Sequence, residues 1–152
     1  MDAVSLGAPD PLSLGALDFV SLGELAQKRF GWKLYTAMRY LTASAELERL
    51  HSSDLSTYPL SGRKLKRGTA WSKQVLERGE PFIGDGAEAI RAAFDDAERI
   101  LACGLVAVIN VPVKAGSQVV GTLNFLREPG GYRREQLAEA QALAVGAADL
   151  FR

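Results

Sequence analysis

The sequence has few residues of the types on which many enzymes and metal sites depend. It has one cysteine, Cys103, and one histidine, His51, among 152 residues. A single cysteine excludes an internal disulfide and any site built from several thiolates. A Cys–His nucleophile pair would need the two side chains in contact and a third group to orient the imidazole. Cys103 lies at the C-terminus of an expected helix, where the helix dipole disfavours a thiolate. We therefore expect a buried structural thiol and neither catalytic nor metal-ligating residues.

The chain also lacks an excess of charge of either sign and any long hydrophobic run. Lys and Arg number 18, as do Asp and Glu, so the formal net charge is zero. This removes the electrostatic argument for a nucleic-acid or membrane partner. No apolar run approaches the roughly 18 residues of a membrane span. The first residues have no basic region and are interrupted by Pro9 and Pro11, unlike a signal peptide, so we expect a cytoplasmic protein.

The residues that are present suit one globular domain. Apolar residues make up 47% and charged residues 24%, an ordinary balance for a soluble protein. The length suffices for one hydrophobic core. We expect a flexible tail over residues 1–11, which are small and contain Gly and Pro, and a single domain over 12–152.

The hairpin expected in the last third is the clearest structural signal. The apolar, β-branched runs Leu105–Val113 and Gln118–Leu126 flank a short connection that contains Gly116. Such runs favour strands, and glycine suits the tight turn between them. Each run also contains one amide, Asn110 or Asn124.

A second pair of strands is expected earlier. Residues 32–40 alternate from Trp32 onward, which predicts a strand with one face in the core, and residues 46–51 can return antiparallel to it. A helix is expected over 12–30, ending before Gly31. Ser21 and Glu24 have capping-box spacing and offer an alternative start.

The remaining pattern predicts helices around a short strand. Thr69 is a candidate N-cap of a helix that ends near Gly79. The segments expected after it are an extended piece at 81–83, a helix over 85–103 and a final helix over 133–151. The final helix has no evident side-chain N-cap, and it is apolar around so much of its girth that it needs two partners, one of which could be a second subunit. Strands bracketed by helices predict an α+β fold, an antiparallel sheet with helices packed on one face.

With these elements, the sequence resembles a GAF domain. The hairpin VINVPVKAGSQVVGTLNFL, the helix GYRREQLAEAQALAVGAADLF and the middle segment GTAWSKQVLERGEPFIGD carry the resemblance. It is closest to small stand-alone bacterial members that have Phe-Asp-Asp ahead of the hairpin, here Phe94-Asp95-Asp96. It implies an antiparallel sheet of five or six strands, with the N- and C-terminal helices on one face and a helix and loop roof over a ligand pocket on the other.

The resemblance leaves the ligand open, because members of the family bind cyclic nucleotides, tetrapyrroles, haem, iron, amino acids or small aromatic acids. Members that attach bilins commonly have histidine after the cysteine, whereas Cys103 precedes Gly104. One group of members that bind cyclic nucleotides has an Asp-Glu pair at a fixed spacing after a phenylalanine. At that spacing after Phe94 this chain has Glu98-Arg99, so the signature is not matched. Reduction of methionine sulfoxide needs several cysteines. The cofactor is therefore unknown.

Eight residues are candidates for contact with a small molecule of unknown identity beneath the roof. An aromatic side chain can be core or line an apolar pocket, and an amide can bind neighbouring backbone, face solvent or bind a ligand. The candidates are Tyr40, Tyr58, Trp71, Phe82, Phe94, Asp95, Asn110 and Asn124.

The acidic pair and the one basic cluster have two interpretations each. Adjacent Asp95 and Asp96 point in different directions on a helix, so paired-acid catalysis is disfavoured. Either they are solvated or one of them bonds across to the 62–67 segment, and one could orient an amine of a ligand. The basic residues of that segment suit either solvent or an anionic ligand.

The sequence therefore predicts a regulatory domain that binds a small molecule and has no catalytic activity of its own. We expect a homodimer formed through the terminal helices, or action through a partner protein, since no output domain follows Phe151. Two alternatives stay open. One is an enzyme acting on a small metabolite, and the other is a dimerisation scaffold whose pocket has collapsed.

Overall fold

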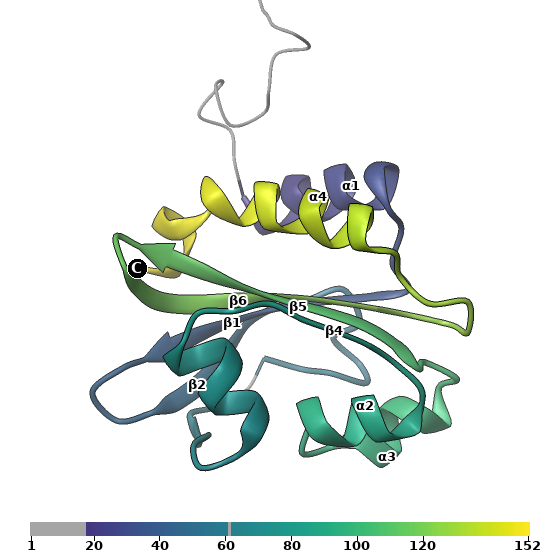
Figure 1. Ribbon diagram of the computed structural model, residues 1–152, viewed down its shortest axis with the longest axis horizontal. Coiled ribbons are helices and arrows are strands. Elements are labelled where there is room, and N and C mark those ends of the chain that lie inside the picture. Colours follow the sequence, from purple (N-terminus) through teal and green to yellow (C-terminus); the bar gives the residue numbers. More distant parts are fainter. Residues whose placement is uncertain (1–17, 61) are drawn as a thin grey trace, which may run out of the picture.

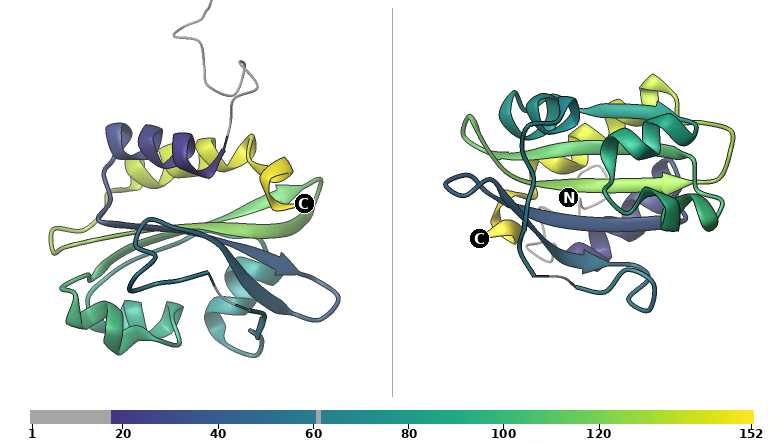
Figure 2. Two further views of the ribbon diagram at one scale, coloured as in Figure 1. Left: turned by 180° about the vertical axis from the view of Figure 1, so that it is seen from behind. Right: turned by 90° about the horizontal axis from the view of Figure 1, so that it is seen from below.

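A central sheet covered on both faces organises the molecule. The computed structural model describes residues 18–60 and 62–152, so the expected tail over 1–11 and the first part of the 12–30 helix lie outside the described residues. Helices α1 (Phe19–Arg29) and α4 (Arg134–Val145) cover one face (Figure 1). Shorter elements cover the other face, and we call them the roof: η1 (Ser72–Glu77), α2 (Ala87–Ala93) and α3 (Ala97–Ala102) (Figure 2).

The sheet has six strands in the order β3-β2-β1-β6-β5-β4, and every neighbouring pair is antiparallel. This confirms the predicted α+β fold with an antiparallel sheet, terminal helices on one face and a roof on the other. The strands are β1 (Leu34–Leu41), β2 (Glu46–Ser52), β3 (Lys64–Leu65), β4 (Phe82–Asp85), β5 (Ala107–Ala115) and β6 (Gln118–Arg127).

The predicted hairpin is confirmed as β5 and β6. Its turn is tighter than expected, because Ala115 already pairs with Gln118 across Gly116 and Ser117. Gly116 has a φ of +65°, a left-handed conformation that glycine adopts without strain. A register shift between Val113 and Lys114 marks a β-bulge.

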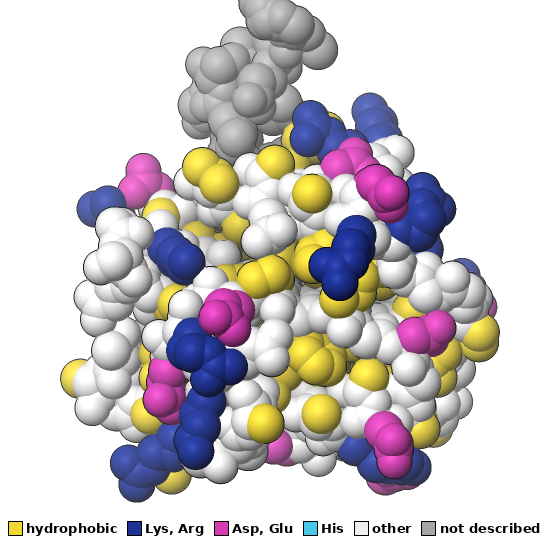
Figure 3. Space-filling model, in the orientation of Figure 1, with side chains coloured by type: hydrophobic (Ala, Val, Ile, Leu, Met, Phe, Trp, Pro, Cys, Tyr) yellow, Lys and Arg dark blue, Asp and Glu magenta, His cyan; other side chains and the backbone are white. Residues whose placement is uncertain are grey.

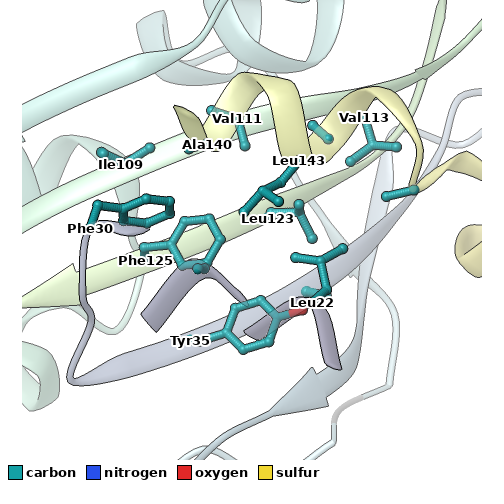
Figure 4. Close-up of a cluster of buried hydrophobic side chains, with 14 of the residues drawn as sticks. Leu22, Phe30, Tyr35, Ile109, Val111, Val113, Leu123, Phe125, Ala140 and Leu143 are labelled. Atoms are coloured by element: carbon teal, nitrogen blue, oxygen red, sulfur yellow. The ribbon is translucent and has the colours of Figure 1, made fainter. Parts of the chain in front are cut away.

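The prediction that β1 has only one face in the core is wrong. Tyr35 and Ala37 are buried under the terminal helices, while Leu34 is buried on the roof side. The sheet is covered on both faces, so a central strand is buried on both as well. Figure 4 shows Tyr35, Phe125 and Phe30 packed with Leu22, Leu123 and Leu143 in the core between the helices and the sheet.

The expected helix over 85–103 is in fact two helices. Phe94 interrupts it with an extended backbone, φ −132° and ψ 135°. The apolar spacing of Ile90, Phe94 and Ala97 continues through the break, but Phe94 packs against two roof clusters instead of continuing the helix. Tertiary packing thus overrides local periodicity here.

The final helix also breaks. Helix α4 ends at Gly146, and a 3₁₀ turn, η2 (Ala148–Phe151), follows. Although no side-chain N-cap was expected, the Gln136 side-chain oxygen accepts a hydrogen bond of 2.7 Å from the Arg133 backbone N–H. Much of the apolar girth of α4 packs in the core of this chain, whereas Val145 is 83% exposed.

Two of the caps expected at helix ends are confirmed. Gly31 follows α1 with a φ of +82°, and the Thr69 hydroxyl accepts a hydrogen bond of 3.0 Å from the Ser72 N–H at the start of the η1 segment. The capping box of α1 lies three residues earlier than the Ser21–Glu24 alternative. Asp18 is the N-cap and Ser21 the reciprocal partner, because the Ser21 N–H donates to the Asp18 carboxylate at 2.7 Å.

Gly121 allows the C-terminal turn to pack directly on β6, and its replacement by alanine should destabilise the fold. An added Cβ would meet the Phe151 ring and lie 2.6 Å from the Met38 carbonyl oxygen. We expect Gly121→Ala to lower the free energy of unfolding by about 1–3 kcal/mol, since it overpacks a dense site. Urea denaturation measures this change. The control is Gly62→Ala, where an added Cβ has no heavy atom within 4 Å, and equal losses in the two variants would contradict the packing argument.

Candidate functional site

A row of polar side chains crosses the middle of the sheet on its roof face. Asn110 of β5 pairs in register with Asn124 of β6, and Asn124 pairs with Thr36 of β1. Their strand neighbours Ile109 and Phe125 point to the helix-covered face. All three polar side chains are buried beneath the roof.

These side chains form a continuous hydrogen-bonded chain, which we call the polar row. The Trp71 indole N–H donates to the Asn110 side-chain oxygen at 3.1 Å. The Asn110 amide donates to the Asn124 oxygen at 2.8 Å, and the Asn124 amide donates to the Thr36 hydroxyl at 3.2 Å. Both amides therefore have protein side-chain partners and neither faces solvent. The row ties the roof to three central strands.

Next to this row lies a small cavity of about 60 Å³. Strands β1, β2 and β3 and the connection between α2 and α3 enclose it. The lining residues are Met38, Leu47, Arg49, Lys64, Lys66, Ala93, Phe94, Asp95 and Asp96. Its walls thus combine apolar side chains with three basic and two acidic groups.

Lys66 is the most unusual group in the cavity wall. Its side chain is only 8% exposed, and its ammonium donates to the Asp95 carboxylate at 2.9 Å. It also lies 5.3 Å from the centroid of the Trp71 ring, within cation–π range. Asp95, in contrast, is 69% exposed. A buried cation is therefore held by an anion that reaches in from the surface, which confirms the predicted bond from the acidic pair to the 62–67 segment.

The structure places the eight candidate residues in three groups. Phe94 and Asp95 line the cavity. Trp71, Asn110 and Asn124 belong to the polar row. The other three do not line the cavity. Phe82 packs between two roof clusters, and Tyr58 is buried in one of them. Tyr40 lines shallow hollows at the surface.

The eight candidates did not include the other seven cavity residues: Met38, Leu47, Arg49, Lys64, Lys66, Ala93 and Asp96. The basic cluster was a usable signal, since Lys64 and Lys66 stand two residues apart and share a face at β3. That they face a cavity depends on the pairing of β3 with β2, which no local pattern indicates.

Tyr58 is a buried phenol whose oxygen has no hydrogen-bond partner among the described residues. Burial, and then the nearby Cys103 and Asp96, raise the pKa of this phenol to about 12. The ring also lies 5.6 Å from the Arg49 guanidinium. Tyr58 therefore stays neutral at physiological pH and packs beside Arg49, which lines the cavity.

The arrangement keeps the candidate nucleophile and base apart. Cys103 is exposed at the end of α3, and the expectation of a buried thiol is wrong because the residue lies beyond the last turn that packs on the sheet. His51 stacks on Phe19 of α1 and lies tilted against the Tyr35 ring, on the other face of the sheet. Within residues 18–60 and 62–152, no group of three His, Cys, Asp or Glu residues is placed to hold a metal ion.

The surface and the helices add two observations. On the face shown in Figure 3, basic and acidic side chains are interspersed with apolar ones, apart from a short column of Lys and Arg at the lower left. No helix in the described part of the chain has the length and hydropathy needed to cross a membrane.

Comparison with known proteins identifies the fold. No protein-family model and no curated protein sequence matches the chain. Among solved structures, a GAF domain/HD domain protein from Geobacter sulfurreducens is similar with a TM-score of 0.71 and 16% identity, covering 87% of this chain and 88% of the other. The GAF domain of a phosphoenolpyruvate-protein phosphotransferase from Coxiella burnetii has a TM-score of 0.68 and 20% identity over 94% and 83%.

A third similar structure is the GAF domain of a two-component sensor histidine kinase from Bacillus halodurans. Its TM-score is 0.65 at 12% identity, and the match covers 89% of this chain and 97% of the other. All three similarities cover most of this chain. This protein therefore has the fold of a GAF domain.

Proposed function

We propose that this protein is a cytoplasmic regulatory domain that senses a small molecule at the cavity between the sheet and the α2–α3 connection. One observation carries the proposal, namely the buried Lys66 in the wall of this cavity. Ligand sites commonly combine apolar walls with a few convergent polar groups, as this cavity does. The names of similar structures, among them a GAF domain of a sensor histidine kinase, agree with a role in regulation.

The distribution of reactive groups favours binding over catalysis. His51 contacts the rings of Phe19 and Tyr35 on one face of the sheet, and Cys103 is exposed at the end of a roof helix. A nucleophile and its base must lie within hydrogen-bond reach of each other. A domain that binds a ligand and transmits the change to a partner protein therefore explains these features better than an enzyme does.

Ligand entry requires the roof to move. A cavity of about 60 Å³ has room for about two water molecules at their liquid volume, whereas ligand pockets commonly measure about 300–1,000 Å³. The connection at Phe94–Asp96 joins helices of only seven and six residues. Helices this short have little stability of their own, so the connection can shift without disturbing the sheet.

The route of signalling belongs to the same proposal. The outer side of the terminal helices exposes Val20 and Val145, at 59% and 83%. A second copy of the chain, or a partner protein, would dock there, and the terminal helices and the sheet would lie between it and the cavity. The polar row links the roof to strands β5, β6 and β1, whose other face packs on the terminal helices.

One observation favours a scaffold with a collapsed pocket instead. Trp71 and the polar row already fill the floor beneath the roof, and both asparagine amides have protein partners. In that account the roof is permanently closed, and the residual cavity holds only water.

Native mass spectrometry with two matched variants tests the sensing function. We expect the purified protein to carry a small-molecule mass that disappears on denaturation. Ala93→Leu should lose this mass because the larger side chain fills the cavity, whereas Ala92→Leu, on the exposed neighbour, should retain it. If the wild-type protein carries no such mass, and no member of a metabolite panel raises its melting temperature, the scaffold account holds instead.

Removal of the central amide should cost stability. Asn124→Ala leaves the Asn110 amide and the Thr36 hydroxyl without their partner in a buried site, at about 1–3 kcal/mol for each group. Urea denaturation measures the free energy of unfolding. The matched control is Thr122→Val on the same strand, since the buried Thr122 hydroxyl has no hydrogen-bond partner among the described residues and its loss should change stability little. A loss below 1 kcal/mol for Asn124→Ala would show that the polar row does not hold the roof to the sheet.

A further inference from the structure

From the cavity walls we infer a ligand class and a gating contact: the cavity takes a small carboxylate with a short apolar chain, which binds Lys66 in place of Asp95. This inference rests on the proposed sensing function. It adds the class of ligand and names Asp95 as the residue that the ligand displaces. The contact between Lys66 and Asp95 is then the closed state of the site.

The charge distribution favours an anion. The cavity is lined by Arg49, Lys64 and Lys66 against Asp95 and Asp96. When Asp95 leaves, three basic groups face one acidic group. A neutral or cationic ligand would leave the buried Lys66 ammonium without an anionic partner, and an unpaired buried charge is costly.

The exposure of the two partners makes exchange feasible. Asp95 is 69% exposed, so its carboxylate regains water when it swings outward. Lys66 is 8% exposed and needs a replacement. A ligand carboxylate supplies the same charge-assisted hydrogen bond that Asp95 gives up. The exchange of one carboxylate for another therefore changes the electrostatic and hydrogen-bonding free energy little.

The net gain then comes from apolar contact. Met38, Leu47 and Phe94 line the cavity beside the charged groups. A short alkyl chain that packs on them is removed from water, which contributes about 0.8 kcal/mol for each buried methylene group. The limited volume of the cavity, even with Asp95 withdrawn, restricts the ligand to small carboxylates.

Displacement of Asp95 also explains how binding would be sensed. Asp95 lies in the connection between α2 and α3, next to Phe94, which packs into two roof clusters. Release of the carboxylate frees this connection at the same step that fills the cavity. Because Lys66 also lies over the Trp71 ring, the change reaches the first member of the polar row.

Isothermal titration calorimetry with sodium propionate at constant ionic strength tests the inference, with propionamide as the uncharged counterpart of the same shape. We expect propionate but not propionamide to bind the wild-type protein. Asp95→Asn should bind propionate at least threefold more tightly, because it removes the internal competitor. Lys66→Met should bind at least tenfold more weakly, and circular dichroism verifies that it is folded. Glu98→Gln is the control, since it removes one charge from the exposed Arg91–Glu98 pair outside the cavity and should leave the affinity unchanged.

Two outcomes would overturn the inference. One is that propionamide binds as tightly as propionate. The other is that the affinity of Asp95→Asn for propionate is unchanged, lower or undetectable. The failure of the broader function looks different. If neutral or cationic molecules bind and Ala93→Leu abolishes their binding, the sensing function stands and only the carboxylate class is wrong. If no molecule of any charge binds, both fail.

Discussion

The structure depends on one constraint: its central strands are buried on both faces, so the asparagine amides in them need partners inside the protein. Asn110 and Asn124 meet this requirement by bonding each other, Thr36 and the Trp71 indole. An unpaired amide in this environment would cost a large fraction of a typical folding free energy. The same bonds fix the roof on the sheet, so the polar row sets both the position of Trp71 and the floor beside the cavity.

The cavity lies between the hydrogen-bonded central strands and a less firmly held segment of the roof. On one side are strands whose register is fixed by backbone pairing and by the apolar core. On the other is the Phe94–Asp96 connection, held by packing of one ring and by a single ion pair with an exposed acid. In the proposed account a ligand carboxylate replaces Asp95 on the buried Lys66, while Asp95 returns to water. The site then combines a rigid floor with a wall that opens when such a ligand binds.

The hairpin, the antiparallel α+β sheet and the helix-capping Gly31 could be predicted, because β-branched runs and glycine act locally. The break at Phe94 could not, since the apolar period continues through it and only roof packing interrupts the helix. The pairing of Asn110 with Asn124 could not be predicted either. Counting back from Ala115 and Gln118 would pair Asn110 with Leu123, and it is the bulge at Val113 and Lys114 that shifts the register by one residue and brings both amides to one face. The role of Lys66 depends on the pairing of β3 with β2, which is long-range.

The most direct test of the account is an NMR titration of the two tryptophan indole N–H signals with sodium propionate. Trp71 lies beside Lys66 on the roof face, whereas Trp32 packs on the helix-covered core and donates its indole N–H to the Gly23 carbonyl at 2.8 Å. The account predicts that the Trp71 signal shifts with added propionate while the Trp32 signal stays in place. A shift confined to Trp32, or no shift in either signal, would contradict binding at the cavity beneath the roof.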